Sequence, residues 1–186
     1  MDSVIIAAAK YLVFAMVVGF GLVWLIAENR RGKVQLALAA VIGLVVLLVL
    51  IKIASASYLD PRPFVPIADG GDGIVPVIPH AIDNGFPSDH SAAAGLMATL
   101  VLLRRKWFAG IWFALGALAV AWGRVAAGLH HLLDVGVGLG LGVVAAAIGV
   151  VCMTLIVRKT SIATAGPLGR WLAAEPEANI TARHRN

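Results

Sequence analysis

Residues 123–134 read GRVAAGLHHLLD, which places one arginine, two histidines and one aspartate between two apolar runs. His130 and Asp134 are four residues apart, so they would share one face of a helix. Arg124 would point away from them on a continuous helix, but a break at Gly128 would let all three side chains converge. If the flanking runs cross a bilayer, these ionisable groups lie near its edge. Placing ionisable side chains in a membrane costs free energy, so we interpret this stretch as a candidate functional site.

Two further polar clusters lie upstream. Prolines on both sides of Arg62 restrict the backbone and disfavour helix, so this arginine is expected on a stiff extended corner. Farther along, Pro87 and Ser88 precede an alanine-rich run, which predicts a helix start with Ser88 as the N-cap. Helix capping alone would account for the presence of Ser88 and Asp89 at this position, but it gives no reason for a histidine at position 90. Free N–H groups and the helix dipole at this end favour anions.

The residue types in these clusters suit phosphoryl transfer. Arginine offers a rigid fork of donors that matches phosphate oxygens. Two histidines offer a nucleophile and a general acid that titrate near neutral pH. Asp134, one turn beyond His130, can hold that imidazole in one tautomer. We therefore expect a phosphohistidine intermediate, with charge stabilised by arginines and backbone amides rather than by a metal or another cofactor.

The elements that position these residues are predicted to be membrane helices. The chain has 186 residues, of which 60% are hydrophobic and 13% charged, and its mean hydropathy is +0.92. Soluble domains carry about 25% charged residues. The long apolar blocks predict an all-α, polytopic membrane helix bundle with about five transmembrane helices, six being the alternative. The expected spans are Val4–Ala27, Val34–Ala54, Ser88–Leu103, Trp107–Arg124 and Leu132–Val157.

The domain organisation is predicted to be simple. Residues 1–160 are expected to form a single transmembrane domain, and residues 161–186 a largely disordered cytoplasmic tail with an interfacial turn at Trp171. The first apolar run continues for more than twenty residues without a basic start, so we interpret it as a span rather than a cleavable signal. With Cys152 as the only cysteine, no intrachain disulfide can form.

The positive charges are interpreted as topology signals. Loops rich in lysine and arginine stay in the cytoplasm. The basic positions that follow this pattern are Arg30, Arg31, Lys33, Arg104, Arg105, Lys106, Arg158 and Lys159. The N-terminus, the connection 55–86 and the stretch 124–134 are then expected together on the outer side. The net charge of +5 therefore does not indicate a nucleic-acid partner.

Together, the three clusters resemble the type 2 phosphatidic acid phosphatase family, membrane lipid phosphatases that share a site with vanadium haloperoxidases. The family pattern is K-x6-R-P, then P-S-G-H, then S-R-x5-H-x3-D. This chain has Gly123 in place of the serine of the third motif and Asp89 in place of the glycine of the second. In the first motif, Ser55 stands where the lysine is expected, and Lys52 lies three residues earlier.

The resemblance implies a role for each matching residue. His130 would be the nucleophile, Asp134 its orienting partner, and His90 the acid that protonates the leaving group. The implied phosphate-binding groups are Arg62, Arg124, Ser88 and the amide of Asp89. Lys52 lies nearly one turn below Ser55 on the same helix face, so we expect it to extend towards the rim and also contact phosphate.

The variant P-S-D-H, preceded by Asp-Pro-Arg-Pro-Phe at residues 60–64, is most similar to the small bacterial branch that dephosphorylates undecaprenyl diphosphate. The product, undecaprenyl phosphate, is the carrier lipid of cell-wall precursors. The resemblance implies a multi-pass protein of the bacterial inner membrane, with the bilayer and a lipid phosphate as its partners and the site facing the exterior. His80, Asp83 and His131 have no motif role and are interpreted as loop hydrogen-bonding residues.

Three alternatives remain open at this stage. Another lipid phosphatase of the same family would act on phosphatidylglycerol phosphate, phosphatidate or a polyprenyl-phosphate sugar. A metal-dependent membrane hydrolase would instead bind a divalent metal ion. Its ligands would come from His80, Asp83, His90, His130 and Asp134. A non-catalytic, transporter-like protein is disfavoured because the ionisable residues gather at one rim instead of lining a path across the bilayer.

Overall fold

The computed structural model describes residues 1–26 and 28–163, and its regular elements in these ranges are all helices. The first helix is continuous but changes type along its length. The elements are α1 (Asp2–Ile6), the π-helical turn η1 (Ala7–Tyr11), α2 (Leu12–Ile26), α3 (Arg30–Ser57), the 3-10 turn η2 (Ile67–Asp69), α4 (Asp89–Leu103), α5 (Trp107–Ala126) and α6 (Leu132–Ala163). The all-α fold class predicted from the apolar runs is confirmed.

Within the described residues, four helices are long and apolar enough to cross a membrane. They are Asp2–Ile26, α3, α5 and the Leu132–Lys159 part of α6, with 25, 28, 20 and 28 residues. Their outer faces carry exposed large apolar side chains such as Phe14, Val45 and Trp112, as a lipid-facing surface requires. The third predicted span, Ser88–Leu103, corresponds to α4, which has only 15 residues and is too short for this class.

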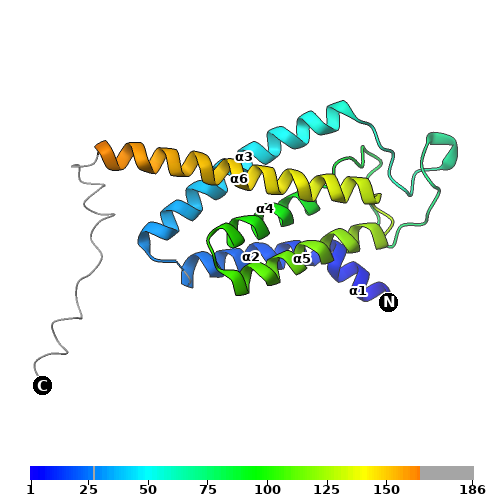
Figure 1. Ribbon diagram of the computed structural model, residues 1–186. Coiled ribbons are helices and arrows are strands. Elements are labelled where there is room, and N and C mark those ends of the chain that lie inside the picture. The colour runs from blue at the N-terminus through cyan, green and yellow to red at the C-terminus, as the bar shows by residue number, and fades with distance from the viewer. Residues whose placement is uncertain (27, 164–186) are drawn as a thin grey trace, which may run out of the picture.

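Helix α4 lies at the centre of the bundle, between the α3–α6 pair and the α2–α5 pair (Figure 1). It is buried on most sides, so it forms the core rather than facing lipid. Glycines bring α6 close to it, because a Cβ at Gly142 would lie 2.3 Å from the Ala92 carbonyl oxygen and one at Gly138 2.5 Å from that of Ser88. This close packing places the start of α4 against the start of α6.

The connection between α3 and α4, the α5–α6 turn and the N-terminus lie at one end of the bundle, and the α2–α3 and α4–α5 turns lie at the other (Figure 1). The predicted grouping of these segments is therefore confirmed. At the second end, Arg104 donates to both carboxylate oxygens of Glu28, at 3.1 and 2.9 Å, and to Gln35 at 3.1 Å. This ion pair joins the α2–α3 connection to the end of α4.

Two predicted boundaries need correction. Residues 28–33 are expected from the sequence to be a loop, but α3 already begins at Arg30 because the Asn29 side chain accepts a hydrogen bond from the amide of Gly32 at 2.8 Å. Helix α6 extends beyond the predicted end at Val157 to Ala163. Ala27, the predicted turn at Trp171 and most of the predicted tail lie outside the described residues.

Candidate active site

The break predicted at Gly128 is present. Helix α5 ends at Ala126, and Gly128 has a φ of +69°, a left-handed conformation that glycine adopts without strain. The amide of Leu129 donates to the carbonyl of Arg124 at 3.1 Å, which closes the turn before α6 begins. The turn brings the side chains of Arg124 and His130 towards each other, as the spacing of the motif predicted.

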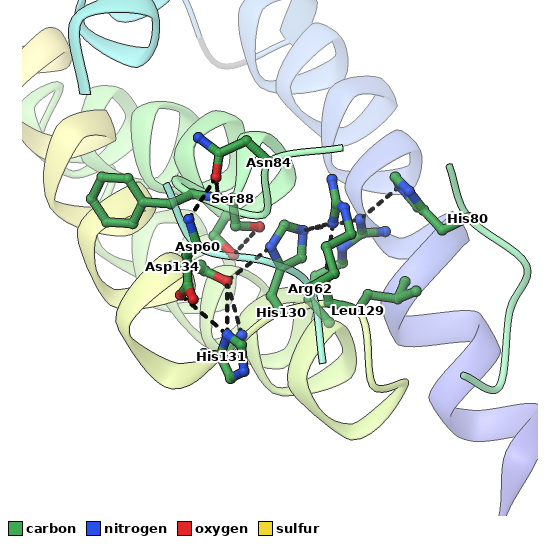
Figure 2. A network of polar contacts seen from close by, with 12 residues as sticks. Asp60, Arg62, His80, Asn84, Ser88, Leu129, His130, His131 and Asp134 are labelled. Atoms are coloured by element: carbon green, nitrogen blue, oxygen red, sulfur yellow. Dashed lines mark hydrogen bonds and ion pairs between the residues drawn. The ribbon is translucent and has the colours of Figure 1, made fainter. Parts of the chain in front are cut away.

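His130 and Asp134 form a buried pair in the centre of the site (Figure 2). His130 Nδ1 lies 3.3 Å from Asp134 Oδ2, and the same oxygen accepts a hydrogen bond from the amide of His131 at 2.9 Å. An ionised carboxylate can only accept hydrogen bonds, so the proton of the neutral imidazole belongs on Nδ1. Nε2 of His130 therefore keeps its lone pair, which a nucleophile requires.

Both arginines of the motifs contact that nitrogen. Arg62 Nη1 lies 3.0 Å from His130 Nε2, and Arg124 Nη2 lies 3.2 Å from it. Burial lowers the pKa of His130 below 6.5, and the two arginine charges lower it further, against the opposing hydrogen bond to Asp134. The imidazole is thus held neutral at neutral pH, which is the state that can attack phosphorus.

Arg62 is fixed by residues of the long connection. Its Nε donates to Asp83 Oδ1 at 2.6 Å, and Nη1 also donates to the carbonyl of Leu129 at 3.0 Å. Burial would raise the pKa of Asp83, but the hydrogen bond and charge of Arg62 hold it below its usual range. The side-chain oxygen of Asn84 accepts hydrogen bonds from the amides of Asp60 and Phe86, at 3.0 and 3.1 Å.

Asp83 therefore contacts the site, although the sequence suggested only loop hydrogen bonding for it, and Asn84 is a neighbour to which the sequence assigned no role. The signal for them was their place immediately before the P-S-D-H motif. That interpretation of Asp83 is confirmed, but its partner is the active-site residue Arg62. His80 likewise contacts an arginine of the site, because its Nε2 lies 3.4 Å from Arg124 Nη2.

A cavity of about 340 Å³ opens in front of His130. Arg62, Arg124, His90 and Asp89 line it, so residues of all three sequence clusters meet there. The backbone amide of Asp89 opens α4, whose first N–H groups have no partner within the helix. The cavity therefore presents the imidazole of His130, a second histidine and several positive or N–H groups to an anion.

Two predicted phosphate contacts differ in the structure. Lys52 has an exposed side chain and, unlike its neighbours Ile51 and Ser55, is not among the described residues that line the cavity. Ser88 is at the N-cap position, but its hydroxyl makes no capping bond and accepts from Ser91 at 3.2 Å instead.

Ser88 nevertheless helps to position the site. Its side chain is fully buried, and its amide donates to the carbonyl of Asp134 at 3.1 Å. This bond joins the start of α4, which carries His90, to the first turn of α6, which carries Asp134. Ser88 is absent from the lining of the cavity among the described residues. Its hydroxyl therefore belongs to the packing behind the pocket.

Behind Asp134 lies a second polar group that no motif predicted. His131 Nδ1 lies 3.1 Å from Asp60 Oδ2 (Figure 2). Nε2 of His131 lies 3.2 Å from Asp72 Oδ2. Burial raises the pKa of Asp60, and the nearby carboxylate of Asp134 raises it further. The predicted loop hydrogen bonding of His131 is confirmed, and this histidine connects the long connection to the start of α6.

Metal-ligand geometry occurs in this second group rather than in the cavity. Donor atoms of Asp60, His131 and Asp134 all lie within 4.8 Å of one another, close enough for one cation to contact all three. None of the three is among the described residues that line the cavity. The five residues considered for a hydrolytic metal do not gather in this way within residues 1–26 and 28–163.

Comparison with known proteins identifies the family. The model of the PAP2 superfamily matches residues 33–158. A Bacillus licheniformis protein described as "Bacitracin transport permease protein BcrC" is 33% identical over 147 residues, covering 78% of this chain and 68% of the relative. "Undecaprenyl-diphosphatase BcrC" of Bacillus subtilis (strain 168) is 29% identical over 151 residues, covering 80% and 72%.

The fold also matches a solved structure. The crystal structure of LpxE from Aquifex aeolicus superposes with a TM-score of 0.61 at 20% identity, covering 79% of this chain and 81% of that one. The matched family segment contains the arginine corner, the P-S-D-H helix start and the His130 turn, which converge on one cavity. The chain is therefore a membrane phosphatase that belongs to the PAP2 superfamily.

Proposed function

We propose that this protein hydrolyses undecaprenyl diphosphate to undecaprenyl phosphate through a phosphohistidine at His130. The observation that carries the proposal is the environment of His130. Its Nδ1 faces the buried Asp134 at 3.3 Å, while two guanidinium groups lie 3.0 and 3.2 Å from Nε2. A neutral imidazole surrounded by donors suited to phosphate oxygens is equipped for attack on phosphorus.

Substrate binding rearranges the contacts of the two arginines. In the empty site, Arg62 and Arg124 donate to His130 Nε2. Oxygens of the terminal phosphate replace the imidazole as acceptors of these hydrogen bonds, because charge-assisted bonds to phosphate are stronger. The amide of Asp89 at the start of α4 binds a further oxygen. The lone pair of Nε2 then points at the phosphorus atom.

The transfer proceeds in two steps. In the first, Nε2 of His130 bonds to phosphorus, the bond from phosphorus to the bridging oxygen breaks, and His90 gives its proton to that oxygen. In the second, His90 takes a proton from water, the water oxygen bonds to phosphorus, and the N–P bond breaks. Inorganic phosphate leaves, and the lone pair returns to Nε2. Asp134 stabilises the positive imidazole ring while the N–P bond exists.

Two observations support this lipid and this side of the membrane. A relative that covers 80% of the chain is described as an undecaprenyl-diphosphatase. The basic residues Arg104, Arg105 and Lys106 lie in the α4–α5 turn, at the end opposite the cavity. Under the positive-inside rule this turn is cytoplasmic. We therefore place the cavity on the outer face of a bacterial inner membrane, where a carrier lipid for cell-wall precursors is recycled.

The test is phosphate release from detergent-solubilised protein, with a chelator present. The substrates are undecaprenyl diphosphate, phosphatidylglycerol phosphate and phosphatidate. We expect turnover of the first to exceed that of the others, sensitivity to vanadate, and an acid-labile phosphoprotein that is absent in His130→Ala. Asp69→Asn, an exposed substitution in η2, is the matched control. Faster turnover of another lipid would reassign the substrate, and wild-type release from His130→Ala would refute the phosphohistidine.

A further inference from the structure

The first membrane helix contains one turn of unusual geometry. Between α1 and α2, residues Ala7–Tyr11 form a π-helical turn, with Ala8 and Ala9 buried. Such turns are rare, shift the hydrogen-bond register of a helix and occur frequently at functional sites. The segment that matches the PAP2 superfamily begins at residue 33, so this turn lies N-terminal to it. None of the three motifs includes any residue of this helix.

The π-helical turn contacts Arg124. Nη1 of Arg124 donates to the carbonyl of Ala9 at 3.3 Å, and Nη2 lies 3.2 Å from Nε2 of His130. Arg124 is 4% exposed and Ala9 is 1% exposed, so neither group exchanges this partner readily for water. One side of the guanidinium is therefore bound by the backbone of the first helix, while the other faces the nucleophile.

Gly123 makes this contact possible. A Cβ at position 123 would lie 2.7 Å from both the Cβ of Ala8 and the backbone nitrogen of Ala9. Most of what it would meet is backbone, including the carbonyl carbon of Ala8 at 2.8 Å, and backbone cannot rotate out of the way. Any side chain at this position would therefore push the π-helical turn away from α5. This is also the position where the motif of the resembling family has a serine.

We infer that the π-helical turn is a positioning element of the active site, in which the Ala9 carbonyl orients Arg124 and Gly123 permits the necessary close approach. The inference rests on the proposed function, because it assigns Arg124 to the phosphate. An arginine that stabilises developing charge must be aimed before the reaction, and small misplacements of such groups are costly in rate. Neither Ala9 nor Gly123 touches the substrate, so both act through Arg124.

The first test is Gly123→Ala, with Gly116→Ala as the matched control on the same helix. Both variants replace glycine by alanine within α5, so they gain the same helix propensity. A Cβ at Gly116, however, would meet only the flexible side chain of Met16, at 3.3 Å and beyond. We expect Gly123→Ala to lower kcat/KM about 10- to 100-fold and to weaken inhibition by vanadate, a transition-state mimic, by a similar factor. Gly116→Ala should stay within about twofold of the wild type, since the flexible Met16 side chain can move by the few tenths of an ångström that the 3.3 Å contact requires.

A second variant removes the π-helical turn itself. Deleting Ala7 removes one residue from the Ala7–Ala9 run and should convert the turn to ordinary α-helix, whereas deleting Ser3 shortens α1 and leaves the turn in place. We expect the Ala7 deletion to reproduce the loss seen in Gly123→Ala and the Ser3 deletion to retain activity. Equal activity of the two deletions would overturn the inference.

A double-mutant comparison separates positioning from a general structural effect. If Gly123 acts through Arg124, then adding Gly123→Ala to Arg124→Ala should cause no further loss of kcat/KM. A further 10-fold loss in that background would show that the substitution damages the fold instead, which would overturn the inference. If the wild type releases phosphate normally and Gly123→Ala is equally active, the inference is refuted but the proposed function is not. Wild-type protein that hydrolyses no lipid phosphate and binds no vanadate refutes the proposed function, and the inference with it.

Discussion

Nη1 of Arg62 lies 3.0 Å from Nε2 of His130, across 68 positions of the sequence, and Nε of the same guanidinium lies 2.6 Å from Asp83. Arg62 thus holds a carboxylate of the long connection and faces the nucleophilic nitrogen at the same time. Because the donors are already in place, little reorganisation is needed when phosphate enters. Burial lowers the pKa of His130, and the charges of Arg124 and Arg62 lower it further.

The first prediction concerns pH. Because burial and the arginine charges lower the pKa of His130 below 6.5, the imidazole stays neutral as the pH falls to 6.5, and kcat/KM should decrease only as the pH falls through the lowered pKa. In Arg62→Gln one of these charges is absent, so the pKa rises and the acid limb should move to higher pH.

The measurement is kcat/KM across the acid and neutral range. The ionisation of the substrate phosphate is followed separately by its phosphorus chemical shift, because that group also titrates at about pH 6. An acid limb at or above pH 6.5 in the wild type would contradict the lowered pKa. A shift to lower pH in Arg62→Gln would contradict the role of its charge.

The second prediction concerns Asp134→Asn. The substitution removes the charge that orients Nδ1 of His130 and stabilises the ring after phosphoryl transfer. We expect kcat to fall by about 10²- to 10⁴-fold, the range that such triad substitutions show. Asp72→Asn is the matched control, because this exposed carboxylate contacts only the far nitrogen of His131. A comparable loss in both variants would show that the contacts of His131, not the orientation of His130, carry the effect.

The third prediction concerns Lys52. Its side chain is exposed and does not belong to the described lining of the cavity, although Ser55 does. Lys52→Ala should therefore retain phosphate release within about twofold of the wild type, as for other exposed positions. Arg62→Ala, measured in parallel, should lose at least about 10²-fold, because a charged donor next to the reacting phosphate is removed. Equal losses in the two variants would restore Lys52 to the phosphate site.

The fourth prediction concerns stability at the opposite end of the bundle. The carboxylate of Glu28 is 5% exposed and accepts two hydrogen bonds from Arg104, which is 24% exposed. Glu28→Gln should lower the free energy of unfolding by about 1–3 kcal/mol, since the pair is only partly buried. The Tm should fall while kcat below the transition stays unchanged, because the cavity is at the other end. An unchanged Tm would mean that the pair contributes nothing.

This stabilisation should also depend on pH. The hydrogen bond from Arg104 holds the pKa of Glu28 below its ordinary value of 4.5, against the effect of burial. A lowered pKa means that the unfolded chain binds the proton more readily. The contribution is therefore complete above pH 4.5 and disappears as the pH falls through the lowered pKa of the folded protein. In Glu28→Gln this part of the acid dependence should be absent.

The sequence by itself determined the features that depend on neighbouring residues. The apolar runs located the helices, although α4 proved to be a central helix too short to qualify as a membrane span. The pairing of His130 with Asp134 followed from their spacing, and the break at Gly128 followed from the one residue that adopts a positive φ there freely. These features need only local backbone geometry and hydrophobic periodicity.

Only the tertiary structure decided which distant groups meet. Asp83 holds Arg62, the π-helical turn at Ala9 holds Arg124, and Lys52 stays outside the cavity. Such contacts depend on the path of an irregular connection and on how closely two helices approach. Periodicity reports the apolar face of a helix but not the neighbour that covers it. For that reason the motifs identified residues of the candidate site, whereas the groups that hold them in position became visible only in the folded chain.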